Sequence, residues 1–367
     1  MSDQNSFGQG REHLSKGNKH MAKRRLVIAG AIAASAALLI SGCSSSDDSA
    51  GKRACMILPD SESSARWENG DRPAMDSALT GAGFETDIQN AQGDTAKYAT
   101  IAEQMLTKGC GVMILVDYQG AGIQVAASAK EAGIPVIAYD RPIEGADYYV
   151  SFDNESVGAL QGQAILDGLA AAGKDPKTAR VIYGQGDPTD GNAKMFFDGA
   201  LSVLEPAGVK PIFEMAGTWD GAKAGTLFEQ ALTAVGGKVD AVLAPNDNNA
   251  ANIITILDKA GLKVPVSGQD ASPAGLQNVL LGKQTTTVWK PYTLIATAAS
   301  DLAIALLNGE TPTADKTLAD GTPYIAVTPN SVGQAQVKDV VAAGDAKYDE
   351  VCTDAVKAAC DEFGVTA

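Results

Sequence analysis

The chain has 367 residues, a length that accommodates two domains of ordinary size. Its composition, 45% hydrophobic and 20% charged, excludes a largely disordered chain. The formal net charge is −15, and removing residues 1–42, which hold six basic and two acidic residues, lowers it to −19. A surface this acidic argues against nucleic acid or an anionic membrane surface as a partner.

The first 42 residues are interpreted as a signal peptide, for which Met1 and Met21 are both candidate starts. Three basic residues precede an apolar run at 26–40, which is shorter than the about 20 residues of a membrane span. The run ends in Ile-Ser-Gly-Cys, which resembles a bacterial lipobox and implies cleavage before Cys43 and a lipid on Cys43. An uncut signal anchor is the alternative, and the small residues before Cys43 argue against it.

Residues 43–51 are polar and are predicted to form a tether, so that the folded part begins near residue 52. Both histidines, His13 and His20, lie in the signal segment. The exported chain would contain no histidine, which excludes histidine-based catalytic triads and histidine metal sites. We therefore expect no catalytic residues, no metal and no cofactor.

Four further cysteines can pair in an oxidising compartment, and four cysteines allow three pairings. In a doubly wound sheet of strand order 2-1-3-4-5, the first and third strands are neighbours about 4.8 Å apart. This order would place Cys55 close to Cys110, although a one-residue shift in register would point them to opposite faces. Cys352 and Cys360 bracket a C-terminal segment and are expected to form the second bridge.

From residue 53 onward, short apolar runs alternate with amphipathic segments. Strands are predicted at 54–60, 84–91, 111–118 and 135–140, with helices at 72–83, 95–109 and 122–133. The same alternation of apolar runs and amphipathic segments begins again later in the chain, with strands predicted at 179–187, 211–217, 241–247 and 264–270. Apolar strands without polar alternation, separated by helices, indicate parallel sheets covered on both faces. The predicted fold class is α/β, with two doubly wound parallel-sheet lobes.

Several of these apolar runs end in an acidic residue at the carboxyl end of the strand. In open parallel sheets, ligands bind outside those ends. The alternative is that each Asp caps the helix that follows it, which is common for any single Asp or Asn. Taken together with three cations, the set favours a polar cleft. The residues are Asp60, Asp140, Asp187, Asp247 and Asp270, with Arg66, Arg141 and Lys290.

This inventory suits a neutral sugar better than an anion. Carboxylates, Arg and Lys can all hydrogen-bond to hydroxyl groups, and the indoles of Trp67 and Trp219 can cover the apolar face of a sugar ring. Packing in the core is the alternative for either Trp. Trp219 lies among turn residues after a predicted strand, so we expect its ring to be partly exposed in the empty cleft, with Trp67 approaching from the other lobe. A phosphate-binding Walker-type sequence is absent.

Motifs spread over about residues 53–340 resemble those of periplasmic sugar-binding proteins of the xylose-binding type, which serve ABC importers. They include PDSESSARWENGDRP, IAYDRPI, YYVSFDNESVGALQGQ, GDPTDGNAKMF, APNDNNA, SGQDASPAGLQNV and TVWKPYTL. The resemblance implies the periplasmic-binding-protein type I fold, with two lobes, three crossovers and a ligand cleft between the lobes.

The resemblance also implies which residues contact the sugar. Asp140 and Arg141 match the main hydrogen-bonding pair of the N-terminal lobe, and we expect each to hold the other's charge when the site is empty. Gly191 and Trp289 depart from the residues common at their positions, which bears on the identity of the sugar. The full set of predicted ligand-binding residues is Arg66, Trp67, Asp140, Arg141, Asp190, Asn192, Trp219, Asn246, Asp270 and Lys290.

The lobes are expected to be discontinuous in sequence. The N-terminal lobe would comprise residues 52–153 and 291–323, and the C-terminal lobe residues 154–284 and 328–367. The chain would cross between the lobes near Asp153, Thr286 and Ala326.

The predicted function is that of a monomeric solute-binding lipoprotein, anchored outside the cytoplasmic membrane through Cys43. It would deliver a monosaccharide, a xylose-like pentose or related hexose, to an ABC transporter permease. A sugar-sensing protein that signals to a receptor is an alternative. A glycoside hydrolase is a weaker one, because the carboxylates are interleaved with Arg, Lys and Asn, which favours ground-state binding over catalysis.

Overall fold

The computed structural model describes residues 52–64 and 66–367. The predicted signal peptide, the lipidation site Cys43 and the tether lie outside the described residues. Among the residues described, no helix is both long and apolar enough to cross a lipid bilayer.

The larger of the sheets has seven strands in the order β10-β11-β5-β4-β3-β1-β2. Neighbouring strands are parallel, apart from the antiparallel pair β10–β11. The predicted order 2-1-3-4-5 is therefore confirmed, with β11 added beside β5. The strands are β1 (Arg53–Leu58), β2 (Glu85–Asn90), β3 (Val112–Leu115), β4 (Val136–Tyr139), β5 (Tyr148–Phe152), β10 (Lys316–Thr317) and β11 (Pro323–Val327).

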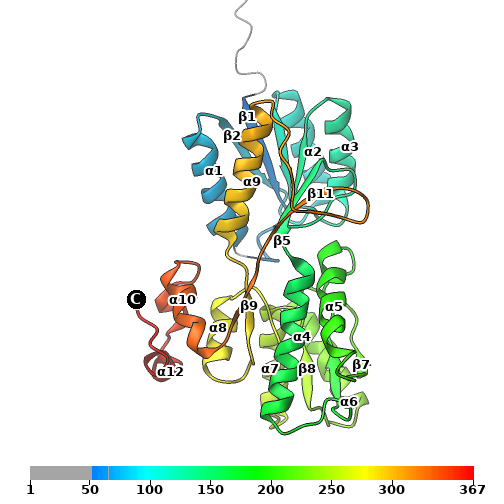
Figure 1. The fold of residues 1–367 in the computed structure, drawn as a ribbon, viewed down its shortest axis with the longest axis vertical. Coiled ribbons are helices and arrows are strands. Elements are labelled where there is room, and N and C mark those ends of the chain that lie inside the picture. The colour runs from blue at the N-terminus through cyan, green and yellow to red at the C-terminus, as the bar shows by residue number, and fades with distance from the viewer. Residues whose placement is uncertain (1–51, 65) are drawn as a thin grey trace, which may run out of the picture. The chain divides into compact units, whose positions relative to one another are not determined.

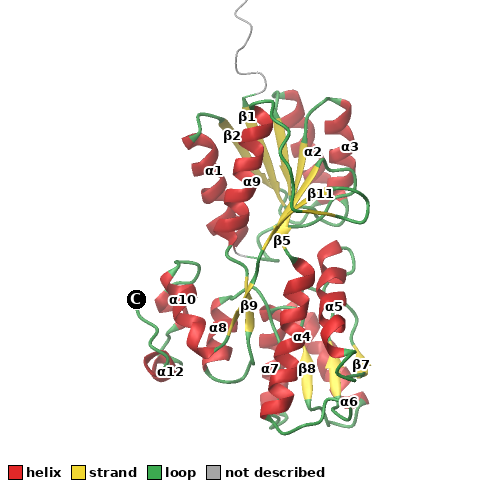
Figure 2. Cartoon of the chain, in the orientation of Figure 1, coloured by secondary structure: helices red, strands yellow, loops and turns green. Residues whose placement is uncertain are grey.

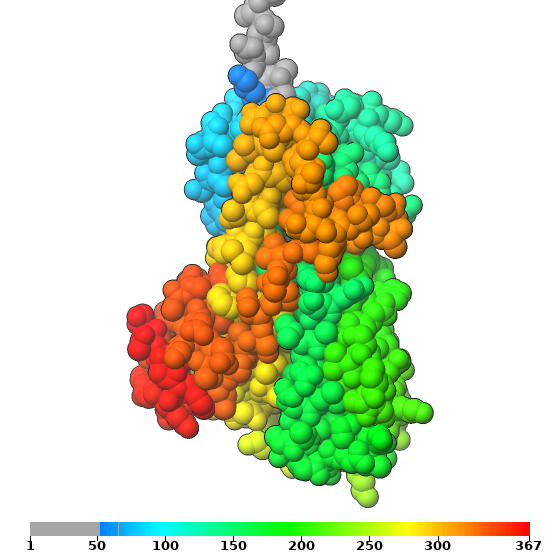
Figure 3. Space-filling view, viewed as in Figure 1, coloured from blue at the N-terminus to red at the C-terminus, as the bar shows by residue number. Residues whose placement is uncertain are grey.

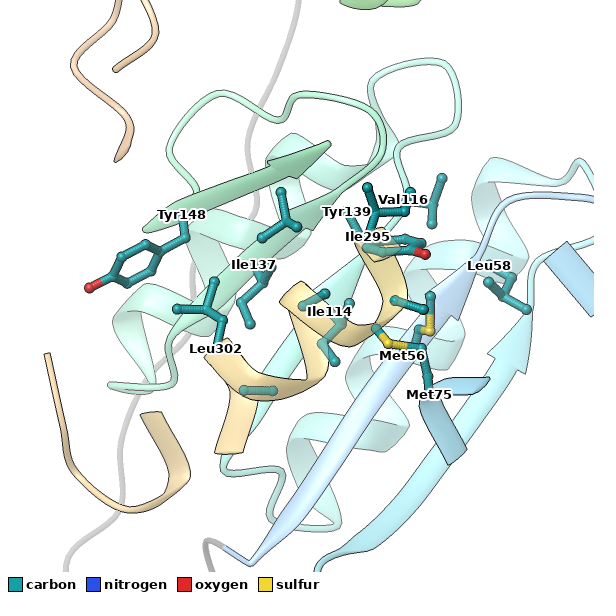
Figure 4. Close-up of a cluster of buried hydrophobic side chains, with 14 of the residues drawn as sticks. Met56, Leu58, Met75, Ile114, Val116, Ile137, Tyr139, Tyr148, Ile295 and Leu302 are labelled. Atoms are coloured by element: carbon teal, nitrogen blue, oxygen red, sulfur yellow. The ribbon is translucent and has the colours of Figure 1, made fainter. Parts of the chain in front are cut away.

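Helices cover both faces of this sheet because its central strands, β1, β3, β4 and β5, are buried on both sides. One face packs α1 and α9 against a cluster that contains Met56, Ile114 and Ile137, as Figure 4 shows. The opposite face packs α2 and α3 (Figure 1). The helices are α1 (Arg72–Gly81), α2 (Thr95–Thr107), α3 (Ala121–Glu131) and α9 (Tyr292–Leu307). The short π-helical segment η1 (Trp67–Asp71) precedes α1.

A second parallel sheet has the order β7-β6-β8 and is also flanked by helices (Figure 2). The prediction of a fourth strand at 264–270 was wrong, because this segment forms only isolated bridges at Val266 and Gln269. Asp270 has a φ of 99°, which takes the chain out of the extended conformation. The elements are β6 (Val181–Tyr183), β7 (Pro211–Glu214), β8 (Ala241–Leu243), α4 (Asn154–Ala171), α5 (Gly191–Leu204), α6 (Gly221–Ala234), α7 (Asp247–Lys259) and α8 (Pro273–Leu280).

The chain leaves the first sheet after β5, returns to it with α9 and leaves it again after β11. The short strands β9 and β12, which flank the return, pair with each other in antiparallel fashion. Figure 3 shows the segment of β10 and β11 in orange beside the yellow-orange α9, on the face in view. The remaining elements are β9 (Thr287–Trp289), β12 (Asn330–Val332), η2 (Gln334–Gln336), α10 (Val337–Ala342), α11 (Tyr348–Val351) and α12 (Lys357–Glu362).

Helices α4 and α5 touch backbone to backbone, and glycines make this contact possible. A Cβ atom added to Gly158 of α4 would lie 1.9 Å from the carbonyl oxygen of Phe196, and one added to Gly199 of α5 would lie 2.1 Å from that of Glu155. No side chain fits at these distances without moving one helix. The spacing of α4 and α5 is therefore set by main-chain contact.

The structure contains both expected disulfides, Cys55–Cys110 and Cys352–Cys360. The first joins β1 to the residue two positions before β3, and the second closes a short loop between α11 and α12. The Cα atoms of each pair lie 5.9 Å apart, within the usual range for a disulfide.

Candidate functional site

A cavity of about 350 Å³ lies at the carboxyl ends of the strands. All ten of the predicted ligand-binding residues line it. They come from the start of η1, the end of β4, the starts of α5, α6 and α7, the turn before α8, and the residue after β9. Within the described chain, no group of three or more His, Cys, Asp or Glu side chains is placed to hold a metal ion.

Each cation of the predicted set has a carboxylate partner inside the cavity. Lys290 Nζ lies 2.7 Å from Asp270 Oδ1, and Arg141 Nε lies 3.6 Å from Asp190 Oδ2. Arg66 donates from Nη2 to the carboxylate of Asp140. The pairs are Arg66–Asp140, Arg141–Asp190 and Lys290–Asp270. The fixed charges of these six residues therefore cancel.

The expectation that Asp140 and Arg141 pair with each other was wrong. Asp140 has a φ of 64°, so the chain turns sharply at the end of β4, and the carboxylate of Asp140 pairs with Arg66 instead of Arg141. Arg141 instead donates to the backbone carbonyl of Asp117 at 3.0 Å and to the hydroxyl of Ser63 at 3.1 Å. Strand ends bring partners together from different parts of the chain, which adjacency in sequence does not reveal.

The pKa values of Asp140 and Asp190, two partly buried carboxylates of the cavity, shift in opposite directions. Burial opposes the ionisation of Asp140, but Arg66, Lys290 and Arg141 outweigh it and hold the pKa of that carboxyl below its usual value. Burial raises the pKa of Asp190, and Arg141 offsets this only in part. The surrounding cations thus favour the ionised, hydrogen-bond-accepting form of Asp140.

Two tryptophans line the cavity in different environments. Trp219 is partly buried, meets the ring of Phe196 edge to face at 6.4 Å, and donates from Nε1 to Asp190 at 3.2 Å. Trp67 is only 2% exposed, and the guanidinium of Arg66 lies 4.4 Å from its ring centroid. Trp219 thus offers part of its ring to the cavity, whereas Trp67 supports the charged group above it.

Two of the predicted polar residues, Asp190 and Asn246, line the cavity and also cap a helix. Capping a helix and lining the cavity are therefore compatible roles for the same side chain. Asp190 accepts a hydrogen bond from the backbone N–H of Asn192, and Asn246 caps α7 in the same way. The amide Nδ2 of Asn192 donates to the backbone carbonyl of Asp140 at 2.7 Å. Asn192 therefore ties the start of α5 to the end of β4.

Sequence reasoning missed several residues that line the cavity. Phe196 lies one helical turn after Asn192, and Lys290 lies 5.2 Å from its ring centroid. The i, i+4 spacing along α5 was a signal that could have identified Phe196. Gln269, Ala271, Ser272 and Pro273 adjoin the predicted strand end at Asp270, and Trp289 stands beside Lys290. The others lie on segments with no strand-end pattern: Ser63, Ser64, Asn69, Gly70, Tyr292, Gly344, Asp345, Ala346, Lys347 and Glu350.

Asp247, the strand-end acid next to Asn246, does not line the cavity. It is fully buried and accepts hydrogen bonds from Gln284 at 2.8 Å, the backbone of Ser272 at 2.9 Å and Thr287 at 2.9 Å. Burial, aided by the negative charge of Asp270, raises its pKa to about 7. Asp247 therefore fastens the loop before α8 to β9 behind the site.

This environment predicts an unusual pH dependence of stability. The folded protein holds a proton on Asp247 more tightly than the unfolded chain does, so the free energy of unfolding should fall as pH rises from about 4 to about 7. Asp247→Asn should remove the part of this slope that Asp247 causes, so that the variant gains about 2–4 kcal/mol of stability over the wild type at pH 8 compared with pH 5. A smaller slope should remain, because burial also raises the pKa of Asp71, to about 6.

Denaturant unfolding at pH 5 and pH 8 measures the effect. Asp240→Asn serves as the control, because the pKa of Asp240 is lowered and the residue stays ionised across this range. An unchanged slope in Asp247→Asn would show that the carboxyl is already ionised at pH 5.

Trp219→Ala should weaken ligand binding by about 3 kcal/mol, the scale of losing a well-packed aromatic side chain. Because the ring also packs on Phe196, the variant should lose some stability as well. Trp219→Phe keeps an apolar ring and should recover most of the stability and part of the affinity. Calorimetric titration together with thermal unfolding separates the two effects. A stability loss with unchanged affinity would make Trp219 a core residue only.

These features define an α/β binding protein with a neutralised polar cavity at the strand ends. Residues 55–311 match the Periplasmic binding protein domain family, and the chain belongs to that family. The type I fold predicted above is confirmed.

Relatives and solved structures agree with this assignment. The D-xylose-binding periplasmic protein of Escherichia coli (strain K12) is 38% identical over 289 residues, covering 75% of this chain and 85% of the relative. The multiple sugar-binding periplasmic receptor ChvE of Rhizobium radiobacter is 34% identical over 317 residues, covering 78% and 89%. A solute-binding protein of a Clostridium phytofermentans ABC transporter, solved with bound β-D-glucose, superposes with a TM-score of 0.73 at 30% identity, covering 82% and 100%. These relatives are binding proteins, so the hydrolase alternative is set aside.

Proposed function

We propose that the protein captures a neutral monosaccharide in this cavity and delivers it to an ABC importer. The observation that carries the proposal is the cancellation of charge among the three ion pairs that line the cavity. Charge-assisted hydrogen bonds from such pairs suit hydroxyl groups, which both donate and accept. An anionic ligand would instead need a surplus of cations.

The partly buried ring of Trp219 supports the same ligand class, because it supplies an apolar surface beside the polar groups. The named ligands of the relatives, D-xylose and β-D-glucose, are neutral sugars. A pentose or a hexose of this kind is therefore the proposed substrate.

A thermal-shift panel tests the proposal, with D-xylose, D-glucose, L-arabinose and D-ribose against D-gluconate and xylose 5-phosphate. A ligand at 100 times its dissociation constant adds about 2.7 kcal/mol of stability. We expect a clear rise in the unfolding temperature for at least one neutral sugar and none for the anions. A response to the anions alone would refute the neutral-ligand assignment.

We further propose that the chain is exported and held on the outer face of the cytoplasmic membrane by a lipid on Cys43, as a monomer. The two lobes would be residues 52–153 with 291–323, and 154–284 with 328–367, closing on the sugar by hinge motion. Metabolic labelling with a fatty-acid analogue should mark the wild-type protein and leave Cys43→Ala unmarked. Labelling of that variant would place the lipid elsewhere.

Sugar sensing is the second candidate, because one relative is described as a receptor. Uptake of radiolabelled sugar separates the two functions. Deletion of the gene should abolish high-affinity uptake if the protein serves transport. Normal uptake with a lost transcriptional response to sugar would favour sensing.

A further inference from the structure

Asp71 is a buried carboxylate that the site described so far does not use. It ends η1, is 0% exposed and does not line the cavity. Its Oδ2 lies 3.2 Å from Nε of Arg66, and its Oδ1 accepts a hydrogen bond from the hydroxyl of Tyr139. Asp71 therefore contacts the cavity-lining Arg66 from the side away from the cavity.

Arg66 is held from three directions. Nε lies 3.2 Å from Asp71 Oδ2 in an ion pair that lacks hydrogen-bond geometry, Nη2 donates to Asp140, and the guanidinium lies over the ring of Trp67. A single guanidinium does not need two carboxylates to be neutralised. The second carboxylate becomes useful when Asp140 turns its acceptor oxygens to a ligand, because Arg66 then still has a buried counterion.

We propose that Asp71, held by Tyr139, is a positioning residue that keeps Arg66 in place over Trp67 and leaves Asp140 free to accept hydrogen bonds from the sugar. The proposal rests on the proposed function for its effect on affinity. The anchoring of Arg66 by Asp71 is a property of the empty protein and can be measured without any sugar.

The ionisation of Asp71 gives this arrangement a measurable pH dependence. Burial raises the pKa of Asp71 to about 6, while Arg66 and the hydroxyl of Tyr139 favour its ionised form. The charged or titratable groups that face it are Arg66, Tyr139, Asp140 and, from the start of α9, Tyr292. Protonation below about pH 6 should loosen Arg66, and Tyr139→Phe should move the midpoint upward.

The chain offers a matched control for Tyr139→Phe. Tyr148 belongs to the same apolar cluster, and its hydroxyl donates to the backbone carbonyl of Pro312 at 3.0 Å. It lies at the start of β5, whereas Tyr139 lies at the end of β4, and Figure 4 shows the two rings on either side of Ile137. Tyr148→Phe therefore removes a similar hydroxyl far from Asp71.

The first measurement uses the empty protein. With Trp219 and Trp289 replaced by Phe, the fluorescence of Trp67 reports on the guanidinium above it. We expect a titration with a midpoint near pH 6 that shifts upward in Tyr139→Phe, stays unchanged in Tyr148→Phe and disappears in Asp71→Asn. The same titration in a folded Asp71→Asn protein, or no shift in Tyr139→Phe, would overturn the proposal.

The second measurement is calorimetric titration with D-xylose and D-glucose at pH 7.5, in the protein with its native tryptophans. Asp71→Asn and Tyr139→Phe should each weaken binding by about 3- to 10-fold, the range for losing one hydrogen bond to a charged group. The double variant should be no weaker than Asp71→Asn alone, because Tyr139 acts through Asp71. Unchanged or strictly additive affinities would overturn the positioning role.

The two arms separate the possible failures. If the wild-type protein binds none of the neutral sugars, the proposed function fails, and the fluorescence titration still decides whether Asp71 anchors Arg66. If Asp71→Asn does not fold, the fluorescence titration and the calorimetric titration are both decided by Tyr139→Phe. A wild-type protein that binds sugar while Tyr139→Phe behaves as Tyr148→Phe in both would refute the inference alone.

Discussion

Asp140→Asn should weaken sugar binding by about 2–4 kcal/mol, the range found when one partner of a buried charge pair is removed. The substitution keeps the shape of the side chain but takes the ionised acceptor from the cavity and leaves Arg66 with Asp71 as its counterion. Asparagine also tolerates the left-handed backbone at φ 64°, so the turn at the end of β4 should persist. Calorimetric titration with the best sugar of the panel measures the loss.

Asp140→Ala provides the comparison that separates charge from backbone strain. Alanine should lose at least as much affinity and, in addition, about 1 kcal/mol of stability, because its Cβ is disfavoured in the left-handed region. Asp240→Asn removes a carboxylate paired with Lys174 outside the cavity and should bind sugar normally. Wild-type affinity in Asp140→Asn would mean that the sugar does not use this carboxylate.

Cys55→Ala/Cys110→Ala should destabilise the protein by about 4 kcal/mol, and Cys352→Ala/Cys360→Ala by about 2.5 kcal/mol. The difference arises because the bonds close loops with sequence separations of 55 and 8 residues, and the longer loop loses more entropy in the unfolded chain. Urea unfolding of each variant beside the wild type measures both values.

The wild-type protein in a strong reductant supplies the control for these variants, since it should approach the stability of the protein with all four cysteines replaced. Sugar affinity should remain unchanged in both pairs, because none of the four cysteines lines the cavity. An equal or larger loss from the C-terminal pair would show that the loop-entropy argument does not describe this molecule.

The first sheet was predictable in order because its strands are apolar on both faces and alternate with helices. The same logic placed Asp140 and Asp270 at one cavity, since the carboxyl ends of parallel strands face the same side, but the strand-end acids Asp60, Asp187 and Asp247 do not line it. The cavity residues Asp190, Asn192 and Asn246 followed from the family resemblance and not from the strand pattern. The segment 264–270 has a similar apolar start but forms only isolated bridges, at Val266 with β8 and at Gln269 with β9, and its backbone turns at Asp270. Local composition does not reveal such a positive φ.

Partners within the site could not be derived in the same way. Arg66 and Asp140 are 74 residues apart, and nothing in either motif identifies the other as its partner. The sequence around Asp71 resembles the start of an ordinary helix and does not indicate that this residue is buried. Its burial beneath Arg66 depends on a tertiary contact, the hydrogen bond from Tyr139 at the end of β4. The residue types of the cavity were thus accessible from sequence, but their pairing was not.

The main-chain contact of α4 with α5 has a consequence for the redesign of this protein as a biosensor. Asp190 and Asn192 stand at the start of α5, and their position depends on this main-chain spacing and on the hydrogen bond that Asn154 of α4 donates to Asn192 Oδ1 at 2.8 Å. A library that changes the recognised ligand should therefore spare the cavity residues that also hold this frame, which are the helix caps Asp190 and Asn246 and the link Asn192 between α5 and β4. Gly158 and Gly199 should be kept fixed in such a library, because even alanine there would push the helices apart and shift every contact that α5 makes with a ligand.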